Sequence, residues 1–164
     1  LLSQSVRRSE VSLLRFGLQG RLEKRLDDDI NDNRTLGLSV EYLRGLGADG
    51  AWSLGASVKN IWSDSATVGG GVFGVNAGRW FGGIGPGLPR VSLSAETRDY
   101  QKWVVTPGGR EDRTLSLRLD VNWPEVSYYG FVPQATLTAR RVWSDVDIYD
   151  RNELSLGLTA VSRF

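Results

Sequence analysis

The sequence predicts an all-β fold of about eight antiparallel strands, and three of its features predict it. Apolar and polar residues alternate in short runs, turn-forming residues separate these runs, and aromatic residues lie near the ends of the runs. One strand and its loop take about twenty residues, and no segment has a helical period over a useful length. We expect the 164 residues to form a single domain, 1–164.

Alternation is clear in the run 115–123, where three leucines at odd positions oppose Ser116 and Arg118. Successive side chains of a strand point to opposite faces of the sheet, so such a run predicts a strand with one apolar face. The pattern occurs in seven runs, 14–22, 36–42, 52–62, 91–98, 115–123, 131–140 and 154–164. We expect an eighth strand between Thr67 and Trp80, because its neighbours need an antiparallel connection there. The many glycines of that stretch leave its apolar face unassigned.

Turn-forming residues fill the gaps between these runs. Asp, Asn, Gly, Pro and Ser are the residues that favour turns and loops. They dominate the segments 27–33, 45–50, 82–89, 107–109 and 144–150. Strands that follow one another with a turn after each predict an antiparallel meander.

Aromatic residues near the strand ends predict which face of the sheet contacts lipid. Trp52 and Trp62 bracket one strand, and the polar positions are mostly Ser, Thr, Gly and Arg. Membrane barrels place aromatic girdles at both interfaces, and small polar residues suit a confined, wet interior. We therefore expect an antiparallel transmembrane β-barrel, integral to a bacterial outer membrane. The expected girdle comprises Trp52, Trp62, Trp80, Trp103, Trp123, Trp143 and Tyr149. Ordinary core packing of these tryptophans, in a soluble barrel or sandwich, is the alternative.

The polar face has an excess of positive charge. With Glu23 and Arg25 included, eight basic side chains on this face stand against four acidic ones. If the face lines a lumen, the interior mildly favours anions. Cross-strand ion pairs that fill a small barrel are the alternative explanation. The expected lumen-facing residues are Arg15, Arg21, Lys59, Glu96, Arg98, Arg118, Asp120 and Arg140.

The composition argues against an enzyme and against nucleic-acid binding. Cys and His are absent, which removes the usual nucleophile–base pairs and the commonest metal ligands. The net charge of +1 provides no electrostatic reason to bind nucleic acid. No apolar run is long enough for a transmembrane helix. We expect no catalytic residue, no metal and no cofactor. The start of the chain lacks the features of a signal peptide, so we expect a mature or trimmed product.

Three motifs have a functional and a structural interpretation. The run 69–74 matches GxGxxG, but no helix is expected after it, so a bulge or tight bend is the better explanation. Asp27, Asp28, Asp29 and Asp32 are candidate calcium ligands, but their spacing is that of a solvated loop. Glu96, Arg98, Arg118 and Asp120 more simply form a cross-strand charge ladder than an acid–base site.

The last third of the chain has a recognisable series of segments. Arg110-Glu111-Asp112-Arg113 opens a strand that ends at Asn122-Trp123, and Gly130-Phe131-Val132-Pro133 opens the next. The loop 144–152 and the closing segment 156–164, which ends at Phe164, complete the series. With these segments the chain from 110 to 164 resembles the end of the surface lipoprotein assembly modifier family. Asp145 departs from the pattern, because an Asn is expected after the Ser.

The resemblance implies a barrel of about fourteen strands that follows a periplasmic helical-repeat domain and delivers lipoproteins or related secreted proteins to the cell surface of Gram-negative bacteria. The chain would then be the C-terminal part of such a translocon. The expected partners are outer-membrane lipid, the cargo protein and a second chain that supplies the remaining strands. The implied last strand and insertion signal comprise Leu154, Leu156, Leu158 and Phe164. A passive channel for small, mildly anionic solutes is the alternative function, and a soluble ligand carrier is the third.

Overall fold

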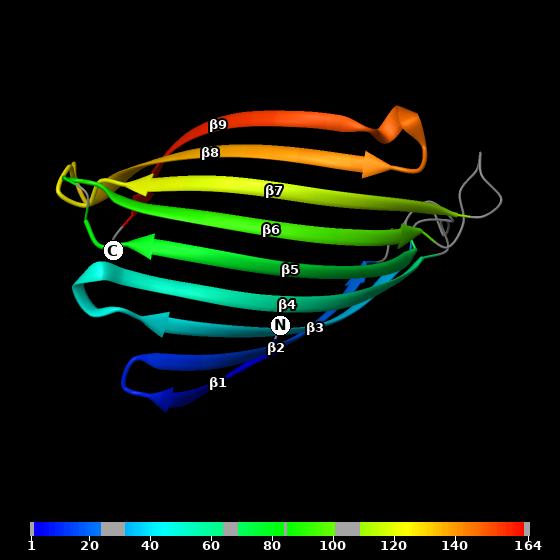
Figure 1. Ribbon diagram of the computed structural model, residues 1–164, viewed down its shortest axis with the longest axis horizontal. Coiled ribbons are helices and arrows are strands. Elements are labelled where there is room, and N and C mark those ends of the chain that lie inside the picture. Colours follow the sequence, from blue (N-terminus) through cyan, green and yellow to red (C-terminus); the bar gives the residue numbers. More distant parts are fainter. Residues whose placement is uncertain (1, 24–31, 64–68, 84, 101–108, 163–164) are drawn as a thin grey trace.

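The computed structural model describes residues 2–23, 32–63, 69–83, 85–100 and 109–162, and within these it contains nine strands in one antiparallel sheet. The strands lie in the order of the sequence, so each pairs only with its neighbours in the chain (Figure 1). They are β1 (Leu2–Ser9), β2 (Ser12–Glu23), β3 (Asn33–Gly45), β4 (Gly50–Ser63), β5 (Gly70–Phe81), β6 (Leu88–Tyr100), β7 (Arg110–Asn122), β8 (Phe131–Ser144) and β9 (Arg151–Ser162). Two short 3₁₀ helices, η2 (Gly47–Asp49) and η3 (Asp147–Tyr149), occupy the β3–β4 and β8–β9 connections.

The all-β antiparallel prediction is confirmed, and each predicted run coincides with a strand, apart from Trp123, which lies one residue beyond β7, and residues 163–164, which are outside the described residues. The stretch expected between Thr67 and Trp80 is β5, which pairs without a register shift with β4 and β6. The glycine run 69–74 therefore leads into a regular strand, and of the bulge or tight bend expected there, the bulge is not found. Gly70 has φ 153, and a Cβ at this position would overlap the Asp99 carbonyl oxygen of β6.

The expected number of eight strands is wrong by one, because β1 was not predicted. Its sequence places Leu2 and Val6 on one face with Gln4 between them, which is too weak an alternation to indicate a strand by itself. Pairing with β2 makes it one, since Leu2 lies opposite Leu18 and Val6 opposite Leu14. A long-range partner stabilises here what the local sequence did not indicate.

The sheet is open, because the edge strands β1 and β9 do not pair within the part of the chain that the structure describes. Each of the eight neighbouring pairs is antiparallel, so β1 and β9 run in the same direction. The described residues thus form a curved single layer and not a closed barrel (Figure 1).

Very little of the sheet is covered. Among the described residues only four hydrophobic side chains are buried, those of Val72, Tyr100, Val132 and Val142. Large apolar side chains such as Leu93 and Leu117 are about half exposed, at 47% and 49%. The helices that the structure describes are too short to cross a bilayer.

Candidate functional site

The strand register divides the side chains into an apolar face and a polar face without a break across the sheet. Directly paired residues of neighbouring strands have their side chains on the same face. One row across all nine strands is apolar apart from a tyrosine hydroxyl, and reads Val6, Leu14, Tyr42, Leu54, Ala77, Leu93, Leu117, Ala139 and Leu154. The adjacent row, on the other face, reads Ser5, Arg15, Glu41, Gly55, Asn76, Ser94, Ser116, Arg140 and Glu153. We call these the apolar face and the polar face.

Curvature distinguishes the two faces, because side chains converge on a concave surface and diverge on a convex one. A Cβ added to Gly55, on the polar face, would lie 2.6 Å from Asn76 Oδ1, whereas one added to Gly20, on the apolar face, meets nothing within 4 Å. The buried strand side chains are all on the polar face as well. They are Ser53, Val72, Tyr100, Arg110, Asp112, Asp120, Val132 and Val142. The polar face is therefore the concave one.

The register places all eight candidate lumen residues on the polar face. Arg15 and Arg21 come from β2, Lys59 from β4, and Arg140 from β8; the other four are Glu96 and Arg98 on β6 and Arg118 and Asp120 on β7. Several of them form ion pairs. Arg15 lies 3.4 Å from Glu41, Arg140 lies 3.5 Å from Glu153, and Arg21 contacts Glu23 of its own strand. Much of the positive charge on this face is thus compensated locally.

The ladder expected from Glu96, Arg98, Arg118 and Asp120 has a different pairing. Arg118 binds Asp120 two residues further along the same strand, at 2.8 Å, and not a carboxylate of β6. Glu96 lies opposite Gly74 and Thr114. The pair forms within the strand because residues two apart share a face, and the sequence alone did not distinguish this from cross-strand pairing.

Asp120 is the centre of a hydrogen-bond cluster at one end of the polar face. Its carboxylate is 5% exposed and accepts bonds from Arg118 Nε at 2.9 Å and from Thr136 Oγ1 at 2.7 Å. Gln134 donates a longer bond, at 3.4 Å. Arg90, its register partner on β6, stacks on Trp80 at 4.2 Å from the ring centre. One guanidinium group therefore binds this buried carboxylate, and a second lies on the paired residue of the next strand.

A second cluster of the same type lies at the opposite end of β7. Arg110, 7% exposed, lies between the rings of Tyr100 and Tyr149, at 3.9 and 4.0 Å from their centres. It also binds Asp112 at 3.0 Å, and Ser144 Oγ donates a 2.7 Å bond to the same carboxylate. These contacts, together with the 3.1 Å bond from the Glu111 backbone N–H to Asp145 Oδ1, tie the β8–β9 loop to β7.

Sequence reasoning missed Arg90, Arg110 and Asp112 as members of the polar face. Each lies beyond the end of a predicted run, at an even position like the polar residues of that run. Extending the runs by a few residues would therefore have included all three. The runs were ended where the apolar side chains stopped, whereas the strands continue because cross-strand pairing extends them.

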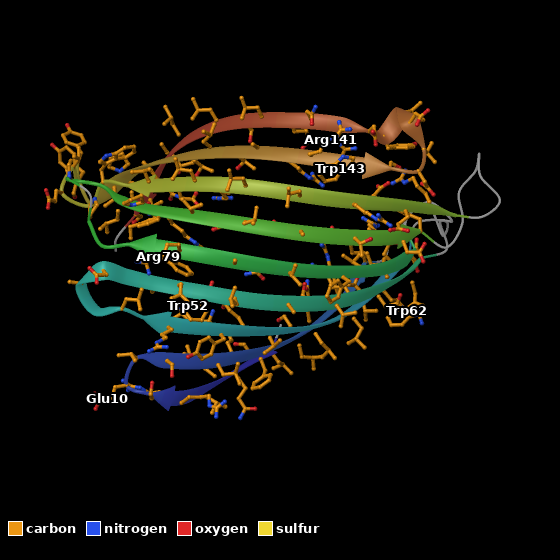
Figure 2. All side chains as sticks on the ribbon, in the orientation of Figure 1. Glu10, Trp52, Trp62, Arg79, Arg141 and Trp143 are labelled. Atoms are coloured by element: carbon orange, nitrogen blue, oxygen red, sulfur yellow. The ribbon has the colours of Figure 1, made fainter. Side chains whose placement is uncertain are left out.

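The aromatic residues expected to form a girdle fall into two groups. Trp52 and Trp62 lie on the apolar face at opposite ends of β4, and Trp143 lies on that face near the end of β8 (Figure 2). Trp123 directly follows β7 and has an odd number, like the apolar-face residues of that strand. Trp80 lies instead on the polar face against Arg90, and Tyr149 covers Arg110. Trp103 is outside the described residues.

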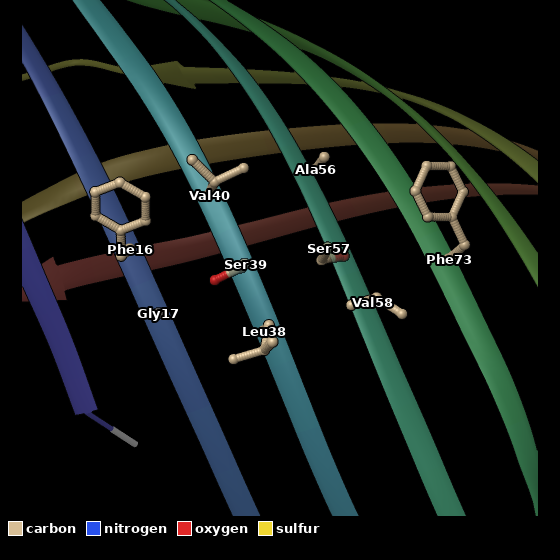
Figure 3. A pocket seen from close by; sticks show the side chains of 9 residues that line it. All are labelled: Phe16, Gly17, Leu38, Ser39, Val40, Ala56, Ser57, Val58 and Phe73. Carbon is tan, nitrogen blue, oxygen red and sulfur yellow. The ribbon is translucent and has the colours of Figure 1, made fainter.

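The apolar face has a shallow hollow over β2–β5. Ala56 is a small residue among larger neighbours, and its position leaves a depression between Phe16, Val40 and Phe73 (Figure 3). The surface of this hollow is almost entirely apolar. Such a surface accommodates hydrocarbon and offers no polar group that would orient a soluble ligand.

The last strand is the most accessible element of the apolar face. Leu154, Leu156 and Leu158 are 76%, 73% and 77% exposed, and every residue of β9 is exposed. Phe164, the other residue of the expected insertion signal, lies outside the described residues.

No metal centre is found in the part of the chain that the structure describes. Groups of three or more potential metal ligands do not occur in it, and Asp27, Asp28 and Asp29 are outside it.

Comparison with known proteins identifies no relative: no family model, no curated protein and no solved structure matches the chain.

Proposed function

We propose that this chain is part of an outer-membrane β-barrel that assists translocation or surface delivery of lipoproteins or related secreted proteins. One observation supports the membrane location above all others. The apolar face is convex and exposed, while the polar face is concave. A contiguous apolar surface across nine strands is far larger than soluble monomeric proteins expose, and lipid would cover it.

The height of the apolar band fits a bilayer. Trp52 and Trp62 are ten residues apart on β4, which corresponds to about 33 Å along a strand. A strand tilted by about 40° would place them about 25 Å apart along the membrane normal, the height of the apolar band of outer-membrane barrels. Both rings would then lie at the interfaces, where amphipathic aromatic groups are favoured.

The two open edges support the involvement of further strands. An unpaired backbone group in hydrocarbon costs several kcal/mol, so neither edge would be stable in contact with lipid. Since β1 and β9 run in the same direction, an all-antiparallel barrel requires an odd number of additional strands between them. If two copies of this chain formed the barrel in the same orientation, β9 of each copy would pair in parallel with β1 of the other. Antiparallel pairing would require one copy to be inverted across the membrane. The proposal therefore includes a partner sheet with an odd number of strands, from another segment or another chain.

The cargo is inferred from the resemblance of the segment 110–164 to the surface lipoprotein assembly modifier family. The sheet would contribute a wet, polar path on its concave face and the edge of β9. That edge lacks the Lys and Pro residues that commonly prevent strand pairing. A strand of an incoming protein has backbone groups suited to such an edge.

A passive channel for small, mildly anionic solutes is the second candidate. The observation in its favour is the surplus of Arg on the polar face, where Arg90 and Arg98 stack on aromatic rings while Arg118 and Arg110 bind Asp120 and Asp112. A channel would need no cargo and no accessible edge.

Surface exposure of a lipoprotein tests the proposal. In Gram-negative cells that lack the full-length protein, a cargo lipoprotein should be protected from added protease, and restoring the protein should make it accessible. The variant Ser57→Trp, which obstructs the polar path, should reduce delivery several-fold. Ala56→Trp, one residue away on the apolar face, should leave delivery unchanged.

The channel alternative gives a different result. Delivery would be independent of the protein, while vesicles containing it would take up small anions faster than cations, and Ser57→Trp would slow that uptake. Gel electrophoresis in detergent without heating, in which a folded barrel keeps its own band, would verify that both variants fold.

A further inference from the structure

The β7–β8 connection presents an aromatic tip at one end of the sheet. Tyr128 and Tyr129 are 75% and 78% exposed, and Val126 beside them is exposed as well. The two rings contact each other edge to face, with centres 4.5 Å apart at 86°. Aromatic side chains of this size are normally covered, so an exposed pair held in one geometry requires an explanation.

Backbone pairing places Tyr128 of this tip on the apolar face. Tyr128 and Phe131 lie opposite each other in an antiparallel bridge, with the Tyr128 N–H donating to the Phe131 carbonyl at 3.0 Å and the reverse bond at 2.9 Å. Residues paired in this way have side chains on the same face. Phe131 has the parity of Leu137 and Trp143, so it belongs to the apolar face, and Tyr128 extends that face beyond the end of β8.

The turn at the tip has a conformation that its sequence does not favour. Tyr129 and Gly130 both have positive φ, 48° and 77°, as a two-residue type I′ hairpin requires. Asn or Gly is the usual residue at the first position, and Tyr129 is the one non-glycine residue with positive φ in the described chain. A bulky side chain in this backbone conformation marks Tyr129 as a candidate functional position.

We propose that the Tyr128–Tyr129 tip anchors this end of the sheet in the headgroup region of the membrane. The inference rests on the proposed membrane location. Tyrosine has an apolar ring and a hydroxyl that stays hydrated, and this combination favours the boundary between acyl chains and headgroups. Trp123 follows β7 on the same face at the same end, so the tip continues an aromatic edge and does not stand alone. Glu125 is the one charged residue of the segment 123–130.

Site-directed spin labelling of the full-length protein tests the anchor. This chain contains no Cys, so any introduced Cys is unique within it. Nitroxide labels would be attached to Tyr128→Cys, Leu93→Cys and Ala48→Cys in phosphatidylethanolamine–phosphatidylglycerol vesicles. Accessibility to oxygen, which concentrates in lipid, would be compared with accessibility to a water-soluble nickel complex. Ala48 is an exposed residue of the β3–β4 turn at the same end of the sheet and represents a turn in water.

The expected result is a graded series. Leu93→Cys should be several-fold more accessible to oxygen than to nickel, Ala48→Cys should show the reverse, and Tyr128→Cys should lie between them. Suppose the label at Leu93→Cys lies in lipid, but the label at Tyr128→Cys is as accessible to nickel as the one at Ala48→Cys. That result overturns the anchor and leaves the proposed function intact. Tyr128→Cys closed to both reagents also overturns it, because protein would then cover the tip. Leu93→Cys accessible to nickel refutes the membrane location itself.

A second variant separates anchoring from folding. Tyr129→Asn suits the positive φ, so the turn should form at least as well as in the wild type. If the tip is an anchor, a nitroxide label at Val126 should become several-fold more accessible to the nickel complex in this variant. The midpoint of unfolding in detergent should not fall. An unchanged label would overturn the anchor.

Discussion

Neighbouring residues of one strand experience opposite environments in this sheet. Leu93 and Ser94 are adjacent on β6, yet Leu93 belongs to an exposed apolar row and Ser94 to a polar row lined by arginines and carboxylates. On the apolar face the side chains are large and diverge, whereas on the polar face they are small or paired and converge. The sheet therefore has no conventional apolar core. Half of the buried strand side chains in the described residues are polar or charged, whereas large apolar side chains such as Leu93 are exposed.

The largest expected effect comes from placing a charge on each face in turn. In the full-length protein, Leu93→Arg should destabilise the folded state in lipid vesicles by about 2–4 kcal/mol, because the guanidinium would lie near the bilayer midplane. Ser94→Arg should cost less than about 1 kcal/mol, since it enters a polar surface that has Glu96 two residues away. Denaturant titration followed by tryptophan fluorescence measures both. Equal costs at the two positions would contradict the assignment of the faces.

An intermediate effect is expected within the polar face, where two ion pairs differ in burial. Asp120→Asn removes a carboxylate that accepts several hydrogen bonds and is 5% exposed, and should cost about 1.5–3 kcal/mol of unfolding free energy. Glu41→Gln breaks only the exposed 3.4 Å pair with Arg15 and should cost about 0–1 kcal/mol. The same titration compares them. A larger loss for Glu41→Gln would mean that the described clusters do not stabilise the sheet.

The smallest effect tests the curvature. A methyl group added by Gly17→Ala would overlap Ser39 Oγ on the concave face, and should cost about 1 kcal/mol because the hydroxyl can rotate away only in part. Gly20→Ala, on the same strand but on the convex face, meets nothing within 4 Å and should be neutral or stabilising by up to about 1 kcal/mol. If both substitutions stabilise the protein equally, the two faces do not differ in curvature as described.

The prediction of strands from the sequence succeeded where the alternation was regular. The run 115–123 became β7, and its leucines and its Ser and Arg residues lie on the faces that parity assigned to them. It failed at β1, whose apolar residues are too few to form a pattern, and it left the face of β5 open. Phe73 and Val75 of β5 lie on the apolar face, whereas Val72 lies buried on the polar face.

The sequence predicted which residues belong to the candidate site better than it predicted their contacts. All eight charged candidates lie on the polar face, because parity is a local property of a strand. Which charges pair was not predictable in the same way. Arg118 binds Asp120 of its own strand, and Trp80, which parity places on the polar face, stacks with Arg90 of β6. These contacts depend on register and on rotamers, which join residues far apart in the sequence.

The sequence by itself determined that this chain forms strands with one apolar and one polar face, since a period of two follows from the geometry of each strand alone. Only the tertiary structure decided which face is concave, that β1 joins the sheet, and that β1 and β9 stay apart with the same direction. The physical reason is that curvature, register and closure are properties of neighbouring strands taken together. They depend on how many strands meet and on which side chains converge, and no local pattern of residues contains that information.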